Sequence, residues 1–299
     1  MAANTRYKDS VFSVLFSDPD ILKELYCALK DVTLPEGLPV TINTLQDVLF
    51  MDRINDISFE IGGKLVILVE HQSTINPNMA LRLLMYIARV YEKIVGDRNI
   101  YTSKKVRIPR PEFFVLYNGA APYQDEEVLR LSDAFEEIGT LGILEQGSPA
   151  LELAVKVVNI NQGRNEGIVK KCKTLFEYSA FVEKVREYEQ GSGSKEQRAK
   201  NKKEGKDNLE AAIKKAIVYC REHDILKEFL EKNATEVINM LMTEWNWDDA
   251  LAVRFEEGRE EVASNALAEG ASIEFVKKIT GFDDETIKKL QEAVNNGAK

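Results

Sequence analysis

The sequence predicts an α/β protein in which a mixed sheet is flanked by helices and followed by an all-helical C-terminal region. Two observations predict it. Between residues 40 and 160, segments that alternate apolar and polar residues, as strands do, are interspersed with helical patterns. Beyond residue 207, every periodic segment has the spacing of a helix. Because a sheet must bury at least one face, we expect the helices to pack against it.

The composition argues against several classes of protein and of functional site. The 299 residues carry 40 Lys and Arg against 49 Asp and Glu, a net charge of −9, which argues against a simple basic coat for nucleic acid. Two histidines and three scattered cysteines offer little for a histidine-based triad, a cysteine zinc site or a disulfide framework. No apolar run reaches the roughly 20 residues of a membrane helix, and no signal peptide is expected, so we expect a cytoplasmic protein.

The N-terminal part is expected to contain a helix and three strands. Apolar spacing predicts the helix over residues 10–30, with a restart at residues 17–19. The strands are expected over residues 40–50, 56–61 and 64–72. Gly62-Gly63 is a two-residue hairpin signal between the last two strands. The continuously apolar run 65–69 predicts burial on both faces.

The remaining elements follow in the same way. Their expected ranges are a helix over 79–95, strands over 113–117 and 151–160, and helices over 166–189, 207–222, 224–245 and 248–268, then a short pair split at Thr280-Gly281. We predict a nuclease-like domain over residues 1–190, a flexible basic linker over 191–206 and a helical region over 207–299. The short pair resembles a helix-turn-helix, but its acidic excess favours packing or self-association, and thus a homo-oligomer formed through the helical region.

The most informative stretch for chemistry runs from Asp56 to Gln72. Glu70 and Gln72 are two apart on one strand and share a face, and the hairpin brings Asp56 opposite the end of that strand. Two converging carboxylates can hold a hard divalent cation such as Mg²⁺. The alternative to a metal site is that these polar residues only mark the solvent-exposed end of the strand. His71 alternates to the opposite face and is expected to be structural or to contact DNA.

Asp56, a hairpin and then Glu70-x-Gln72 resemble the PD-(D/E)xK nuclease superfamily, with Gln in the usual Lys position. The chain is more closely similar to the bacterial Rpn family of recombination-promoting nucleases and putative transposases. The segments that carry this likeness are YKDSVFSVLF (7–16), RINDISFEI (53–61), LVILVEHQSTIN (65–76), LRLLMYIARVYEKI (81–94), FFVLYNG (113–119), AIVYCREHDILKEFL (216–230) and FEEGREE (255–261).

The resemblance implies a restriction-endonuclease-like fold and metal-dependent endonuclease cleavage of double-stranded DNA in recombination or transposition. Asp56 and Glu70 would be both catalytic residues and ligands of Mg²⁺, or of Mn²⁺ or Ca²⁺. Gln72 would stand where the superfamily's Lys orients water or stabilises charge, and Gln cannot supply that charge. A lysine from elsewhere, such as Lys8 or Lys93, would then be needed, or activity would be slower.

Two readings of function therefore stay open. The first is the metal-dependent nuclease, and the alternative is a weakly active or inactive nuclease fold that binds DNA or a protein. Basic side chains that could meet DNA phosphates under either reading are Lys8, Arg82, Arg89, Lys104, Lys105 and Arg107. The last three belong to the connector 98–110, which holds five basic residues and no acidic one.

Overall fold

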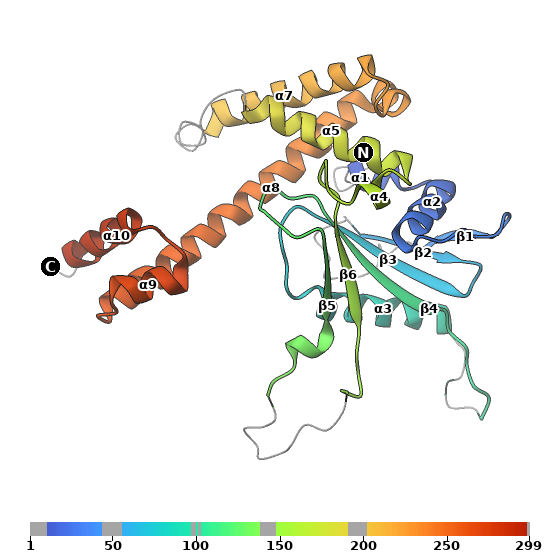
Figure 1. The fold of residues 1–299 in the computed structure, drawn as a ribbon, viewed down its shortest axis with the longest axis horizontal. Helices are drawn as coiled ribbons and strands as arrows, with labels where there is room; N and C mark the ends of the chain where they lie inside the picture. Colours follow the sequence, from blue (N-terminus) through green and yellow to red (C-terminus); the bar gives the residue numbers. More distant parts are fainter. Residues whose placement is uncertain are drawn as a thin grey trace, which may run out of the picture. The chain divides into compact units, whose positions relative to one another are not determined.

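The centre of the fold is a six-stranded sheet (Figure 1). The structure, a computed structural model, describes residues 11–43, 56–96, 100, 103–137, 148–190 and 202–297. The strands are β1 (Val40–Asn43), β2 (Asp56–Ile61), β3 (Leu65–Gln72), β4 (Arg110–Tyr117), β5 (Glu126–Arg130) and β6 (Ala154–Asn159), in the spatial order β1-β2-β3-β4-β6-β5. β3, β4 and β6 run parallel, and the other pairs are antiparallel. The predicted mixed sheet is confirmed.

Helices cover both faces of this sheet (Figure 1). Helix α3 (Met79–Val95) packs on one face through an apolar cluster that includes Leu83, Ile87 and strand residues such as Val66. The opposite face carries α1 (Val11–Leu15), α2 (Pro19–Lys30), α4 (Glu166–Val169) and α5 (Lys173–Gln190). Six consecutive residues of β3 are buried, as the apolar run predicts, because helices lie on both of its sides.

Three local differences from the sequence prediction have physical causes. The β2–β3 loop has three residues because Ile61 pairs with Leu65, which leaves Lys64 in the turn beside Gly62 and Gly63. The helix expected over 166–189 is broken between α4 and α5. Strand β5, EEVLR, lies at the sheet edge, where charged side chains replace the apolar alternation that would have predicted it.

The contacts divide the chain into two compact units, residues 1–242 and 243–299. In the first unit α7 (Lys202–Glu222) packs against α5. Of the predicted linker 191–206, residues 191–201 lie outside the described residues, and residues 202–206 already belong to α7. The proposed boundaries of the nuclease domain stay a prediction.

The predicted helical C-terminal region is confirmed. Helix α8 (Lys227–Ala268) replaces the two helices expected over 224–245 and 248–268, and its non-helical residue is Asn233. Its start is delayed because Asp224 and Leu226 have positive φ angles. The second unit also contains the expected short pair, α9 (Ile273–Thr280) and α10 (Asp284–Gly297), around a small apolar core. In the described part of the chain, none of the helices combines the length and apolarity that a membrane crossing requires.

Candidate functional site

The motif residues lie at the carboxyl end of β3. Side chains alternate there as predicted: Gln72 contacts Met79 at the start of α3, whereas His71 points to the opposite face. Glu70 shares the α3 side with Gln72, because Nε2 of Gln72 donates a hydrogen bond to Oε1 of Glu70 at 2.8 Å. The chain therefore presents an acidic and an amide side chain together, facing the first turn of a helix.

Glu70 is buried, with 4% of its surface exposed, and a cation accompanies it. Nη2 of Arg82 lies 3.0 Å from Oε1 of Glu70, and the same nitrogen donates to the Tyr86 hydroxyl at 3.0 Å. A buried carboxylate is costly unless it is paired and hydrogen-bonded, and both conditions are met at Oε1 of Glu70. We call Glu70, Gln72, Arg82 and Tyr86 the Glu70 cluster.

Asp56 lies on β2, the strand next to β3, directly opposite Glu70. The register of β2 on β3 pairs the Cα atom of Asp56 with that of Glu70. Residues that face each other in an antiparallel ladder occupy the same side of the sheet. The described part of Asp56 is its backbone. The predicted convergence of these two sequence positions is thus present in the strand register.

The donor chemistry of this pair suits a hard cation. Mg²⁺ is commonly held by one or two carboxylates and several waters, and Mn²⁺ and Ca²⁺ also accept such oxygen ligands. Among the side chains that the structure describes, no group of three His, Cys, Asp or Glu residues could hold a metal ion. A metal site at this edge would therefore need ligands beyond the described side chains, such as the carboxylate of Asp56, and Glu70 is already in contact with Arg82.

Of the two lysines considered for the site, Lys93 does not join the Glu70 cluster. Lys93 is exposed and lies about three turns, roughly 16 Å, further along α3 than Arg82. Lys8 lies outside the described residues. The cation that the structure brings to Glu70 is Arg82, which the sequence suggested only as a DNA contact.

His71 is part of the core and not of the surface. Its ring stacks on Phe12 with centroids 4.8 Å apart, and its Nε2 lies 3.2 Å from the Tyr178 hydroxyl. Burial lowers the pKa of His71 to about 3, with a smaller contribution from the nearby positive charge of Arg186. Of the two roles expected for His71, the structure supports the structural one.

The other candidate DNA contacts are spread out. Arg89 is exposed and pairs with Glu92 at 3.7 Å. Lys104, Lys105 and Arg107 are exposed in the segment that leads into β4. Because β4 pairs Arg110 with Leu65 and Val115 with Glu70, that segment enters the sheet about 17 Å from Glu70, at the opposite end of β3. These three side chains therefore do not converge on the Glu70 cluster.

A polar group at the ends of β4 and β6 was only partly expected. Arg186 of α5 donates from Nη1 to Oδ1 of Asn118 at 3.1 Å and to Oδ1 of Asn161 at 2.8 Å, and from Nη2 to the Asn118 carbonyl. The backbone N–H of Asn118 in turn donates to the backbone carbonyl of Gln72 at 2.8 Å. Asn118 was recognisable as the end of a strand, but nothing in the pattern of α5 distinguishes Arg186 from a surface arginine.

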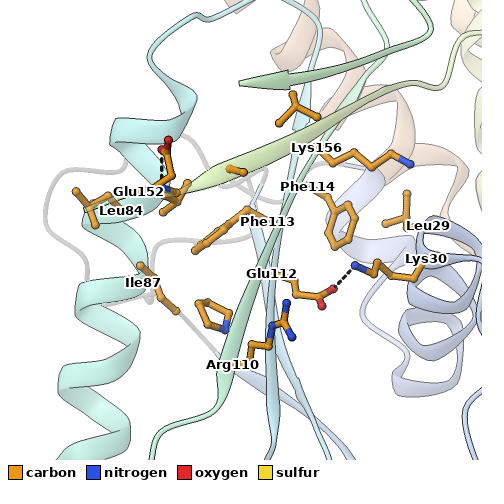
Figure 2. A pocket seen from close by; sticks show the side chains of 14 residues that line it. Leu29, Lys30, Leu84, Ile87, Arg110, Glu112, Phe113, Phe114, Glu152 and Lys156 are labelled. Atoms are coloured by element: carbon orange, nitrogen blue, oxygen red, sulfur yellow. Dashed lines mark hydrogen bonds and ion pairs between the residues drawn. The ribbon is translucent and has the colours of Figure 1, made fainter. Parts of the chain in front are cut away.

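A separate cavity lies away from the Glu70 cluster. A cavity of about 680 Å³ opens beside the start of β4, between α2 and α3, where Lys30 pairs with Glu112 at 3.3 Å (Figure 2). Its lining includes Leu29, Leu84, Ile87, Arg110, Phe113, Phe114 and Lys156, and contains none of the Glu70 cluster. This cavity is therefore separate from the candidate site.

The fold and site together define a mixed α/β protein with an acidic motif at the end of a central strand. Residues 24–169 match the family described as "Putative transposase, YhgA-like". The matched segment contains all six strands and the Glu70 cluster, and it confirms the predicted resemblance to the putative transposases. No curated protein and no solved structure matches this chain.

Proposed function

We propose that this protein is a metal-dependent DNA endonuclease that hydrolyses phosphodiester bonds in recombination or transposition. The observation that carries the proposal is the register of Asp56 on Glu70 at the end of β3, with Gln72 hydrogen-bonded to Glu70. Two carboxylate positions side by side on one face supply the donor type that a hard cation needs. The transposase family of residues 24–169 supports a DNA substrate.

The proposed reaction adds one water across a phosphodiester bond. The water oxygen forms a bond to phosphorus, the bond from phosphorus to one deoxyribose oxygen breaks, and that oxygen leaves with the bonding electrons. The attacking water loses its proton to solvent, and the leaving oxygen gains one. When bound, a divalent cation polarises a phosphoryl oxygen and lowers the pKa of a coordinated water. Asp56 and Glu70 would hold it, while Gln72 fixes the Glu70 carboxylate through its amide.

The test is nicking of supercoiled plasmid by the full chain with Mg²⁺, Mn²⁺, Ca²⁺ or EDTA. We expect metal-dependent nicking that Asp56→Ala and Glu70→Ala both abolish. Glu60→Ala is the matched control because Glu60 lies on the same strand as Asp56 but pairs with Val66 and bonds Asn43 at the sheet edge. Nicking that survives either site variant would contradict the assignment of the ligands.

One observation favours a second candidate, a nuclease fold that binds DNA without cutting it. The Arg82 guanidinium contacts the carboxylate that a metal would need, and Gln72 brings no charge. In that case wild-type protein would shift a DNA duplex in a gel yet leave plasmid intact with every metal. Such a result would replace the nuclease proposal by the binding module.

A further inference from the structure

Arg82 is brought to the motif by the fold and not by its neighbours in sequence. It projects from the first turn of α3, and its Nη2 reaches Oε1 of Glu70 on β3 at 3.0 Å. Contacts with the Tyr86 hydroxyl at 3.0 Å and the Met79 sulfur at 3.4 Å hold the guanidinium in place. The Arg82 side chain is 30% exposed, whereas that of Glu70 is 5% exposed. The guanidinium therefore bridges a buried carboxylate and the solvent.

The charge balance of the proposed site makes the position of the Arg82 guanidinium important for the reaction. Attack on a phosphodiester develops further negative charge on the phosphoryl oxygens, so a site that stabilises it needs a positive potential. Asp56 and Glu70 contribute two negative charges, which one divalent cation would only balance. Gln72 is neutral. Arg82 is the cation that contacts this group within the described part of the chain.

We propose that Arg82 is a catalytic residue of this site, whose guanidinium contacts the scissile phosphate and supplies the positive charge that Gln72 cannot. This inference rests on the nuclease function proposed above. A guanidinium has five N–H donors in a planar fork, so it can contact a carboxylate and a phosphate together. Because arginine stays protonated, Arg82 stabilises charge and takes no proton from the attacking water.

The same contact has a consequence for metal affinity. Arg82 and a metal ion compete for the negative charge of Glu70, so removing Arg82 leaves that charge to the metal. We therefore expect opposite effects in Arg82→Gln: weaker cleavage and tighter binding of metal. A side chain that only supports the fold would weaken both.

The experiment compares wild type with Arg82→Gln, Arg82→Lys and the double variant Gln72→Lys/Arg82→Gln, all in the full chain. Single-turnover nicking is measured with saturating metal, and Mn²⁺ affinity is measured without DNA by electron paramagnetic resonance.

We expect Arg82→Gln to nick about 10²- to 10³-fold more slowly and to bind Mn²⁺ several-fold more tightly. Arg82→Lys should retain part of the rate, because it keeps the charge but loses the planar fork. The double variant should recover at least about tenfold over Arg82→Gln, since it returns a cation beside Glu70.

The matched control is Arg164→Gln, which breaks another arginine–carboxylate pair, with Asp125 at 2.9 Å, and should change neither reading. Wild-type nicking that Arg82→Gln leaves unchanged would overturn the role of Arg82 and leave the nuclease function standing. Slower nicking with weaker Mn²⁺ binding, or with no recovery in the double variant, would make Arg82 a structural residue. Wild-type protein that leaves the plasmid intact with every metal tested would overturn the nuclease function, and this role with it.

Discussion

Gln72 donates a hydrogen bond from Nε2 to Oε1 of Glu70 at 2.8 Å, from two positions further along the same strand. The bond ends on a carboxylate that is 4% exposed, so Gln72 compensates part of the cost of burying that charge. A second amide–carboxylate bond, from Asn43 to Glu60 at 3.2 Å, lies at the sheet edge. The two bonds share their chemistry and differ in burial.

We expect Gln72→Leu to lower the free energy of unfolding by about 1–3 kcal/mol, because a buried charged acceptor loses a donor. Asn43→Ala should cost about 0.5–1 kcal/mol, because water can replace the donor at the edge. Urea unfolding monitored by circular dichroism measures both values. Equal decreases in the free energy of unfolding would mean that burial of Glu70 does not increase the contribution of its hydrogen bond to stability.

His71 is expected to make stability depend on pH. Burial lowers its pKa from the ordinary value of 6.5 to about 3, so between these values the unfolded chain binds the proton and the folded chain does not. The contribution of His71 to stability is therefore complete above pH 6.5 and is lost as pH falls toward 3, by up to about 1.4 kcal/mol per pH unit.

The variant His71→Phe separates this effect from packing. It should be less stable than wild type at pH 7.5, because the hydrogen bond between His71 and the Tyr178 hydroxyl is lost, yet its stability should fall less steeply from pH 6.5 to 4.5. His223→Gln, which replaces an exposed histidine, is the matched control. Chemical unfolding at several pH values gives the slopes, and a slope unchanged in His71→Phe would refute the assignment.

The strands of the motif could be predicted because their signals are local. Alternation gives β2 the bounds Asp56–Ile61, and an apolar stripe gives α3 the bounds Met79–Val95, both as observed. Pairing across the glycine turn then follows, and it brings the start of β2 next to the end of β3. The exact register could not be predicted: a two-residue turn would pair Asp56 with Val69, whereas the observed turn of three residues pairs Asp56 with Glu70.

The partners of the motif could not be predicted, because they depend on how elements pack. Arg82 lies twelve positions after Glu70 (82 − 70), and only the placement of α3 across the end of β3 brings their side chains together. Arg186 comes from a helix far along the chain and contacts Asn118 at the end of β4. Edge strand β5 gives a weak signal since its side chains alternate between exposed and half-buried.

Gly119 is required by the close approach of two strand ends. A Cβ atom at this position would lie 2.0 Å from the carbonyl oxygen of Ser73 and 2.4 Å from the Tyr117 hydroxyl. The first of these atoms is backbone, so it cannot turn away as a flexible side chain would. The segments that follow β3 and β4 must therefore separate if any side chain is added.

We expect Gly119→Ala to destabilise the fold by more than about 2 kcal/mol through this displacement. Gly167→Ala is the matched control: a Cβ there meets nothing within 4 Å, and alanine favours the helix that contains it by about 0.5–1 kcal/mol. Thermal and urea unfolding of both variants test the difference. A Gly119→Ala protein as stable as wild type would show that the two segments can move apart at little cost.

The exposed basic residues before β4 should bind DNA through its phosphates. Lys104, Lys105 and Arg107 are exposed in a connector whose sequence holds no acidic residue. Lys170 and Lys171 pair with Glu166 at 2.7 Å and Asp31 at 2.5 Å. Each phosphate contact that is lost removes about 0.9 from the slope of log K against log salt concentration. Replacing the three connector residues by glutamine should therefore lower that slope by about 2–3. Fluorescence anisotropy with a DNA duplex in EDTA, between 50 and 200 mM salt, measures this slope.

The control variant is Lys170→Gln/Lys171→Gln. It should change the slope by less than about one, because carboxylates already neutralise these lysines. A larger loss in this pair than in the connector variant would assign the DNA contact to Lys170 and Lys171 instead.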